Sequence, residues 1–273
     1  MVLKKKISIL GCGWFGFPLG KSLVKKGYKV LGSTTTPQKL LLLKAQGIDS
    51  YLLQLPPTIN KPSDQFFKSD ILIITIPPRS PDYLNQITQL KDLLILHGTK
   101  RVIFISSTSV YENDNREIDE TTPAMPESAS GKLMRSAEEL LLTSEEFKTT
   151  IIRFSGLIGP GRHPARFLAG KVNIPNGRAP VNLIHLDDCI GIIEAVIEKD
   201  MFGKIFNGVC PDHPTRKEFY TLASKLKENV EPLFIDELLD WKIVKSSEIL
   251  PHLNYQFKIK DLSQWLHSAL AND

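Results

Sequence analysis

Three glycines near the start of the chain stand at a spacing that has a chemical use. Gly11, Gly13 and Gly16 follow the apolar run 7–10 and precede an amphipathic helix. In such a turn the first glycine makes the bend, the second lets the backbone approach a pyrophosphate, and the third allows close helix–strand packing. The helix's positive end favours the phosphate charge, although a turn used only for packing is the alternative. The expected dinucleotide contacts are Gly11, Gly13, Trp14, Phe15 and Gly16.

A hydroxyl-rich stretch follows the second expected strand, residues 28–31. In folds that bind NAD, a carboxylate near this strand end commonly holds the ribose 2′-hydroxyl. Here the sequence offers hydroxyls and an amine, with no carboxylate to repel a 2′-phosphate. The stretch therefore favours NADP over NAD, although hydroxyl-rich turns also serve as helix caps. The expected contacts are Ser33, Thr34, Thr35 and Lys39.

Two later strand ends carry further candidate groups. The apolar run 71–78 has the pattern of a buried parallel strand, and its prolines close it at the carboxyl end, where ligands lie in open α/β sheets. The run 100–111 ends in a cluster of hydroxyls, which either bind a ligand or bond the backbone of their own strand end. The expected cofactor contacts are Ile76, Pro77, Pro78 and Ser106.

A basic stretch between residues 153 and 171 suits an anion. Arginine binds phosphate or carboxylate through two parallel hydrogen bonds, and a solvated surface loop is the alternative. His163 has no Cys or Asp at metal-ligand spacing, so we expect no metal site. The expected anion-binding residues are Arg153, Arg162, His163 and Arg166.

These groups need a scaffold, and the chain has the pattern of one. Apolar strands alternate with helices over about the first 200 residues, which predicts an α/β fold with a doubly wound, Rossmann-like parallel sheet. With 273 residues the chain is long enough for a main domain and a smaller lobe.

Composition narrows the class of protein. The hydrophobic content of 42% and charged content of 23% are ordinary for a globular protein, and no apolar run is long enough to span a bilayer. The net charge of +4 is mild and dispersed, so nucleic-acid binding has little support. The three cysteines are far apart, which suits the reducing cytoplasm.

Several motifs occur in a fixed order: the glycine turn, SSTSVY (106–111), RFSGLIGPGR (153–162), VNLIHLDD (181–188) and KIFNGVC (204–210). The chain thereby resembles the extended short-chain dehydrogenase/reductase family, the NAD-dependent epimerase/dehydratases of nucleotide sugars, and in particular an atypical bacterial branch of it. That family carries SSxxVYG, YxxxK, RxxNxxGPG and FIHVDD in the same order. The resemblance covers roughly residues 5 to 270.

The resemblance implies an organisation and partners. It implies a Rossmann NAD(P)-binding domain at residues 1–161 plus 181–209, and a small C-terminal α+β substrate lobe at 162–180 plus 210–273. It also implies an anionic small-molecule substrate such as a nucleotide sugar. By analogy, a homodimer would form through the helices near 81–97 and 128–145.

One departure from the family concerns its proton relay. A family tyrosine exchanges the substrate's hydroxyl proton, and a lysine four residues later lowers the tyrosine pKa. Anchoring on Pro126 and Glu138 places Ser130 at the tyrosine position and Met134 at the lysine position. An unactivated serine is a very weak acid and methionine has no charge. We therefore expect the usual relay to be absent.

Three hydroxyl residues remain as catalytic candidates: Ser107, Tyr111 and Ser130. Ser107 matches the family's substrate-orienting serine. Tyr111 matches the tyrosine of SSxxVYG and is expected to be mainly structural. His185 is expected to support the cleft wall, and Asp187 to be the N-cap of the following helix.

Three functions stay open from the sequence. The first is an NAD(P)-dependent oxidoreductase or epimerase with a non-standard active site. The second is a non-catalytic NADP-binding sensor or scaffold. The third, a β-hydroxyacid-type dehydrogenase, shares the glycine spacing but usually has a long all-helical C-terminal domain, which the α/β pattern here does not support.

Overall fold

The computed structural model describes residues 5–55 and 61–270, which belong to two compact units. Unit 1 takes residues 1–110, 126–152 and 196–205, and unit 2 takes residues 111–125, 153–195 and 206–273. The bounds of these units follow from how tightly the parts of the chain pack together. The boundaries expected between the cofactor domain and the substrate lobe divide the chain by function instead, and they stay a prediction.

A seven-stranded sheet runs through the fold, with the strand order β10-β7-β5-β4-β1-β2-β3. Its strands are β1 (Lys6–Leu10), β2 (Lys29–Thr34), β3 (Asp49–Leu52), β4 (Ile71–Ile74), β5 (Arg101–Ser107), β7 (Lys148–Phe154) and β10 (Ile205–Gly208). The pairs β1–β2, β2–β3, β1–β4 and β4–β5 are parallel. The predicted Rossmann-like sheet is therefore confirmed.

The strand order reverses beside β1, since β2 and β3 lie on one side of it and β4 and β5 on the other. In open α/β sheets ligands bind at this switch point, outside the carboxyl ends of the strands. The glycine turn follows β1 and Thr75 follows β4. Both segments therefore lie where the fold class places a ligand.

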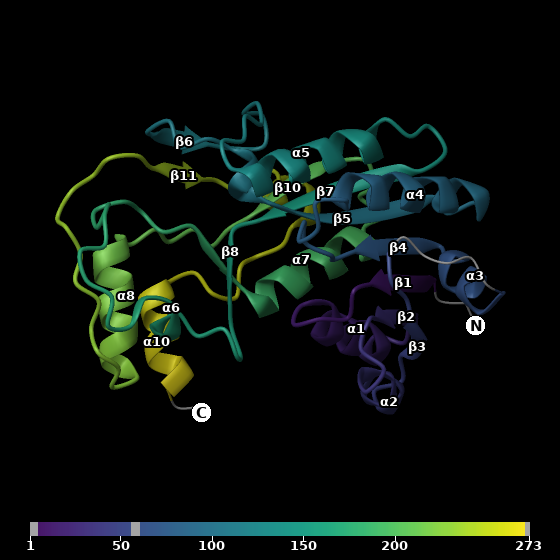
Figure 1. The fold of residues 1–273 in the computed structure, drawn as a ribbon, viewed down its shortest axis with the longest axis horizontal. Helices are drawn as coiled ribbons and strands as arrows, with labels where there is room; N and C mark the ends of the chain where they lie inside the picture. The colour runs from purple at the N-terminus through teal and green to yellow at the C-terminus, as the bar shows by residue number, and fades with distance from the viewer. Residues whose placement is uncertain (1–4, 56–60, 271–273) are drawn as a thin grey trace. The chain divides into compact units, whose positions relative to one another are not determined.

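Helices cover both faces of the sheet in unit 1. They are α1 (Gly16–Lys25), α2 (Lys39–Ala45), α3 (Lys61–Phe67), α4 (Tyr83–Leu96) and α5 (Ala129–Leu142), with a 3₁₀ turn, η1 (Thr108–Val110). Figure 1 shows α4 and α5 side by side along one face and α1 on the other. Because both faces are covered, an inner strand must be apolar throughout, and every residue of β4 is buried.

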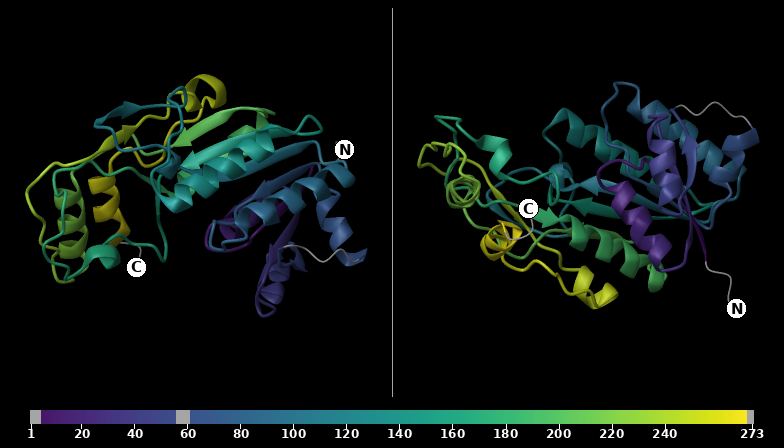
Figure 2. Two further views of the ribbon diagram at one scale, coloured as in Figure 1. Left: turned by 45° about the horizontal axis from the view of Figure 1, so that its top comes forward. Right: turned by 90° about the horizontal axis from the view of Figure 1, so that it is seen from below.

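Unit 2 contains two small parallel sheets, β11–β6 and β8–β9, and several helices. Its elements are β6 (Arg116–Ile118), β8 (Gly156–Ile158), α6 (Ala165–Leu168), β9 (Leu183–His185), most of α7 (Leu186–Glu198), α8 (Arg216–Leu226), β11 (Lys242–Val244), α9 (Ile249–Leu253) and α10 (Leu262–Leu270). Helices α8 and α10 pack together, green and yellow in Figure 2. Their core includes Phe219, Leu262 and Trp265.

Two local predictions need correction. Strand β4 ends at Ile74 rather than at residue 78: the Thr75 N–H still donates to the Leu10 carbonyl at 3.0 Å, but Pro77 and Pro78 have no N–H with which to continue the strand pairing. Asp187 is not an N-cap: it lies in the first turn of α7, and its N–H donates to Nδ1 of His185 at 3.2 Å. Burial lowers the pKa of His185, which favours the neutral ring that accepts this bond.

In the described part of the chain, no helix combines the length and the apolar character needed to cross a membrane.

Candidate dinucleotide site

The glycine turn joins β1 to α1, and each glycine has a separate role in it. Gly11 has φ of +104°, which L side chains rarely adopt. A Cβ on Gly16 would collide with the Gly11 carbonyl oxygen, so this glycine permits the close approach of α1. A Cβ on Gly13 would meet no described atom within 4 Å. The open space beside Gly13 is what a pyrophosphate requires, so the turn fits a dinucleotide.

Side chains from both neighbouring strands contact Gly11. Its N–H donates to Ser33 Oγ at 2.9 Å, and the next N–H, of Cys12, donates to the Ser33 carbonyl at 2.7 Å. Directly after β4, Thr75 Oγ1 lies 2.6 Å from the Gly11 carbonyl oxygen and 2.9 Å from that of Leu10. Ser33, expected to touch the cofactor, thus touches the turn. Thr75 was not predicted from the sequence as a site residue.

The other three predicted residues at and after the end of β2 are one buried residue and two exposed ones. Thr34 is buried, and its Oγ1 accepts the N–H of Thr36 at 3.1 Å. Thr35 and Lys39 are exposed, with Lys39 at the first position of α2. Of the four predicted residues, these two are therefore the ones accessible to a 2′-phosphate.

Five further predicted contacts lie in the turn or directly after β4. Phe15 is buried and Trp14 is half-buried. After β4, Ile76 and Pro78 are half-buried and Pro77 is exposed. The topology places both segments at the switch point, and their contact with a cofactor stays a prediction.

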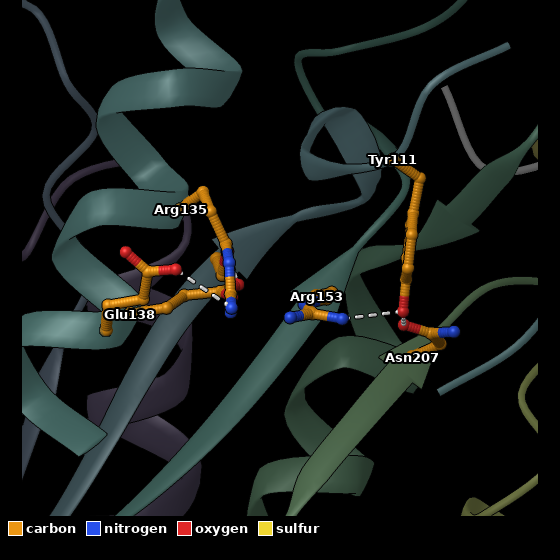
Figure 3. A network of polar contacts seen from close by, with 7 residues as sticks. Tyr111, Arg135, Glu138, Arg153 and Asn207 are labelled. Atoms are coloured by element: carbon orange, nitrogen blue, oxygen red, sulfur yellow. Dashed lines mark hydrogen bonds and ion pairs between the residues drawn. The ribbon is translucent and has the colours of Figure 1, made fainter. Parts of the chain in front are cut away.

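A buried carboxylate lies behind the hydroxyls at the end of β5. Glu138 of α5 is fully buried and accepts a hydrogen bond from Ser106 Oγ at 2.6 Å. Nη1 of Arg135, one helical turn earlier, lies 3.3 Å from its other oxygen (Figure 3). Two donors thus compensate a buried charge. Ser106 is engaged within the protein, and its cofactor role stays a prediction.

Ser107 has a different environment from Ser106. It is half-buried, and its Oγ accepts the N–H of Ser109 at 3.1 Å, at the start of η1. This bond is the alternative expected for these hydroxyls, in which they bond the backbone of their own strand end. Accepting it does not use the hydroxyl's own proton, so Ser107 retains a donor for a carbonyl or alkoxide oxygen.

The positions matched to the family's tyrosine and lysine lie in the first half of α5. Ser130 is exposed, with its Oγ 3.4 Å from that of Ser128, the helix N-cap. Met134 is only 5% exposed, and its Sδ lies 3.8 Å from the Tyr83 hydroxyl, which also donates to the Ile76 carbonyl at 3.2 Å. Met134 is therefore a packed core residue between α4 and α5.

Tyr111 lies in the interior of unit 2 with Arg153. Its hydroxyl accepts from Arg153 Nη1 at 2.7 Å and donates to Asn207 Oδ1 at 3.0 Å (Figure 3). The guanidinium also lies over the tyrosine ring, 4.9 Å from its centroid. Burial raises the pKa of Tyr111 despite the opposing charge of Arg153. These contacts favour the structural role expected for Tyr111. Asn207 was not predicted from the sequence as a site residue.

The predicted anion-binding residues divide between the surface and the interior of unit 2. Arg162 and Arg166 are exposed. His163 is half-buried, its Nδ1 accepts the N–H of Ala165 at 3.3 Å, and its ring lies 5.9 Å from that of Trp265. Arg153, by contrast, is only 2% exposed. The accessible cations of the set are therefore Arg162 and Arg166.

Asp188 is a further residue that sequence reasoning missed. It is buried, and its carboxylate accepts the Tyr255 hydroxyl at 2.7 Å and the N–H groups of Lys258 at 2.7 Å and Ile259 at 3.1 Å. It therefore joins α7 to the segment before α10. The sequence signal that could have indicated it is the acidic pair Asp187–Asp188. One carboxylate is enough at the start of a helix, so the other is available for a different role.

Comparisons with known proteins agree with this fold. Residues 6–125 match the family model for the NAD binding domain of 6-phosphogluconate dehydrogenase. Residues 85–207 match that for the NAD dependent epimerase/dehydratase family. Protein YeeZ of Escherichia coli strain K12 is 38% identical over 267 residues, which is 94% of this chain and 97% of that protein.

Solved structures share the architecture at low identity. The UDP-glucuronic acid 4-epimerase from Bacillus cereus, in complex with NAD, aligns with a TM-score of 0.79 and 19% identity over 98% of this chain and 99% of that one. The human epimerase family protein SDR39U1, with NADPH, aligns with a TM-score of 0.71 and 16% identity over 98% of this chain and 100% of that one.

Proposed function

The chain belongs to the extended short-chain dehydrogenase/reductase family of NAD-dependent epimerase/dehydratases, in the branch of YeeZ, and from this we propose that it binds NADP in preference to NAD and acts on an anionic small molecule. The observation that carries the proposal is the glycine turn. Its open space at Gly13, beside a Gly16 that no larger residue can replace without a collision, suits a dinucleotide pyrophosphate.

The preference for NADP rests on the exposed end of β2. Thr35 offers a hydroxyl and Lys39 an ammonium group, and residues 32–39 include no carboxylate. A 2′-phosphate would form an ion pair with Lys39, whereas a neutral 2′-hydroxyl has no charge to pair with the ammonium group. The NADPH named for the human relative supports the view that this fold accepts the phosphorylated cofactor.

The substrate class rests on Arg162 and Arg166 of unit 2. Two exposed guanidinium groups four residues apart can bind a phosphate or carboxylate. A nucleotide sugar offers such groups, and UDP-glucuronic acid is named for the epimerase from Bacillus cereus. We therefore propose a nucleotide sugar or a related anion as the substrate.

The chemistry would differ from that of the family at the proton-transfer step. A bound NADP would supply hydride exchange. The chain must then hold the substrate oxygen and supply or accept its proton. Ser107 retains a hydroxyl proton at the end of β5, whereas Ser130 is exposed and Met134 has no titratable group. Ser107 is accordingly the proposed contact for the reacting oxygen, with a water molecule as the proton's route to solvent.

Calorimetric titration with NADP and NAD in parallel tests the cofactor. We expect NADP to bind more tightly, and Lys39→Gln to weaken NADP binding about tenfold while NAD binding stays unchanged. Lys44→Gln, an exposed lysine in the last turn of the same helix, is the matched control and should change neither. Equal affinity of the wild type for both dinucleotides would overturn the preference.

Burial of Met134 favours a second candidate function, a non-catalytic NADP-binding sensor or scaffold. A core methionine at the lysine position indicates a helix that packs rather than one that activates a proton donor. A screen of nucleotide sugars and carbonyl compounds, followed at the nicotinamide absorbance band, separates the two. Turnover that disappears in Ser107→Ala supports the enzyme; tight NADP binding with no turnover supports the sensor.

A further inference from the structure

We propose that Ser33 and Thr75 form a hydroxyl clamp on Gly11 that fixes the phosphate-binding turn, and that Ser33 acts on the cofactor through Gly11 rather than by touching a 2′-phosphate. The inference rests on the proposed dinucleotide site. It assigns a positioning role to Thr75, which lies outside the glycine motif, and it changes the role expected of Ser33.

The clamp holds both polar groups of one residue. The Gly11 N–H donates to Ser33 Oγ at 2.9 Å, and the Gly11 carbonyl oxygen lies 2.6 Å from Thr75 Oγ1. Gly11 has φ of +104° and no Cβ, so its own conformational preferences leave the turn free to adopt other shapes. Two hydroxyl contacts on opposite sides of the residue restrict the rotation of both adjoining peptide groups.

The clamp is tied to the sheet rather than to the loop. Ser33 is 22 residues from Gly11 at the end of β2, and Thr75 is 64 residues away after β4. These are the two strands that pair with β1. A turn held in this way loses little freedom on binding, and such preorganisation strengthens affinity.

The position of Ser33 argues against direct contact with a phosphate. The residue is only 2% exposed, so its hydroxyl is shielded from a cofactor phosphate while its oxygen accepts the Gly11 N–H. Thr35 and Lys39, in contrast, are exposed. The stretch after β2 therefore has two tasks: Ser33 sets the turn that receives the pyrophosphate, which both dinucleotides share, and the exposed residues distinguish NADP from NAD.

Calorimetry on Ser33→Ala separates these tasks. We expect NADP and NAD to bind about tenfold more weakly, with the ratio of their two affinities unchanged, because an orphaned Gly11 N–H disturbs the turn for both. Lys39→Gln should show the opposite pattern, with a changed ratio. A Ser33→Ala variant that weakens NADP alone would overturn the clamp and make Ser33 a phosphate ligand.

Thr75 provides a pair of variants that keeps the test independent of folding defects. Thr75→Val has nearly the same shape without the hydroxyl and should weaken both dinucleotides, whereas Thr75→Ser keeps the hydroxyl and should bind within about twofold of wild type. Thermal unfolding confirms that each variant is folded. Equal affinities for Thr75→Val and Thr75→Ser would overturn the clamp. A wild type that binds neither dinucleotide would instead overturn the proposed function, and the clamp with it.

Discussion

The glycine turn and the first half of α5 lie in the same unit, yet they relate to the family pattern in opposite ways. In the turn, Gly11 and Gly16 occupy positions where backbone conformation or a backbone collision demands glycine. In α5, Ser130 faces solvent and Met134 fills the core against Tyr83. The backbone of the glycine turn leaves space beside it, whereas Met134 of α5 packs against other side chains of the protein.

Under the proposed function, this difference would separate cofactor binding from turnover. A pyrophosphate site made of backbone needs only the turn and the strands that hold it. A proton relay needs two titratable side chains on one helix face, and the loss of both leaves an ordinary amphipathic helix. The predictions below test how sharply the two segments differ.

The largest expected effect is at Gly16. In Gly16→Ala the new Cβ meets the Gly11 carbonyl oxygen, so we expect the free energy of unfolding to fall by about 3 kcal/mol and dinucleotide binding to be lost as well. Gly13→Ala is the matched control, because its Cβ enters open space: stability should stay within about 0.5 kcal/mol of wild type while affinity falls. Urea unfolding and calorimetry measure both. Tight NADP binding by Gly16→Ala would contradict the assigned geometry.

The next effect concerns the return of the family's lysine. Met134→Lys places an ammonium group in a core position, so we expect a loss of roughly 3 kcal/mol in urea unfolding at neutral pH. Met134→Leu should cost less than about 1.5 kcal/mol, since it keeps an apolar side chain of similar volume. A stable Met134→Lys protein with stronger dinucleotide binding would show that α5 still accommodates a cofactor-binding lysine.

A pH dependence should come from Tyr83, which packs on Met134. Burial raises the pKa of Tyr83 above the value of about 10 that it has in the unfolded chain. Its contribution to stability is therefore complete below pH 10 and is lost as the pH rises through the folded-state pKa. We expect Tyr83→Phe to cost about 1 kcal/mol at pH 8, for the lost bond to Ile76.

Above pH 10 the wild type should lose stability faster than Tyr83→Phe, by up to about 1.4 kcal/mol per pH unit. Urea unfolding of both proteins between pH 8 and pH 11 measures this, and the other buried tyrosines cancel in the difference. Parallel curves would mean that the Tyr83 hydroxyl is open to solvent.

The smallest effect should be at Ser130. Its side chain is exposed, so Ser130→Ala should change the free energy of unfolding by less than about 0.5 kcal/mol and leave NADP affinity unaltered. Should the chain prove to be an enzyme, the same variant should keep its turnover number. A large loss of turnover in Ser130→Ala alone would show that this serine had replaced the tyrosine as proton carrier.

The sequence allowed the fold and the turn to be predicted because both depend on local patterns. The apolar run of β4 and the glycine spacing can each be recognised within a few residues, and the alternation of strands and helices predicts a parallel sheet. The sequence shows that residues 33–36 are polar, but it does not indicate that Ser33 is buried and Thr35 exposed.

The unpredicted contacts are those made between distant parts of the chain. Thr75 reads as one more residue of an apolar strand, and only the pairing of β4 with β1 brings its hydroxyl to Gly11. Tyr111 was expected to be structural, yet nothing in the sequence indicates that Asn207, 96 residues later, accepts its proton. Local patterns carry no information about such partners.

The anchoring of Asp188 has a consequence for biosynthesis. Its carboxylate is buried, and its donors are the Tyr255 hydroxyl and the N–H groups of Lys258 and Ile259. Because these N–H donors lie 70 and 71 residues after Asp188 in the sequence, unit 2 can reach its final packing only after residue 259 has emerged from the ribosome. Until then it is the part of the protein that chaperones and proteases would meet.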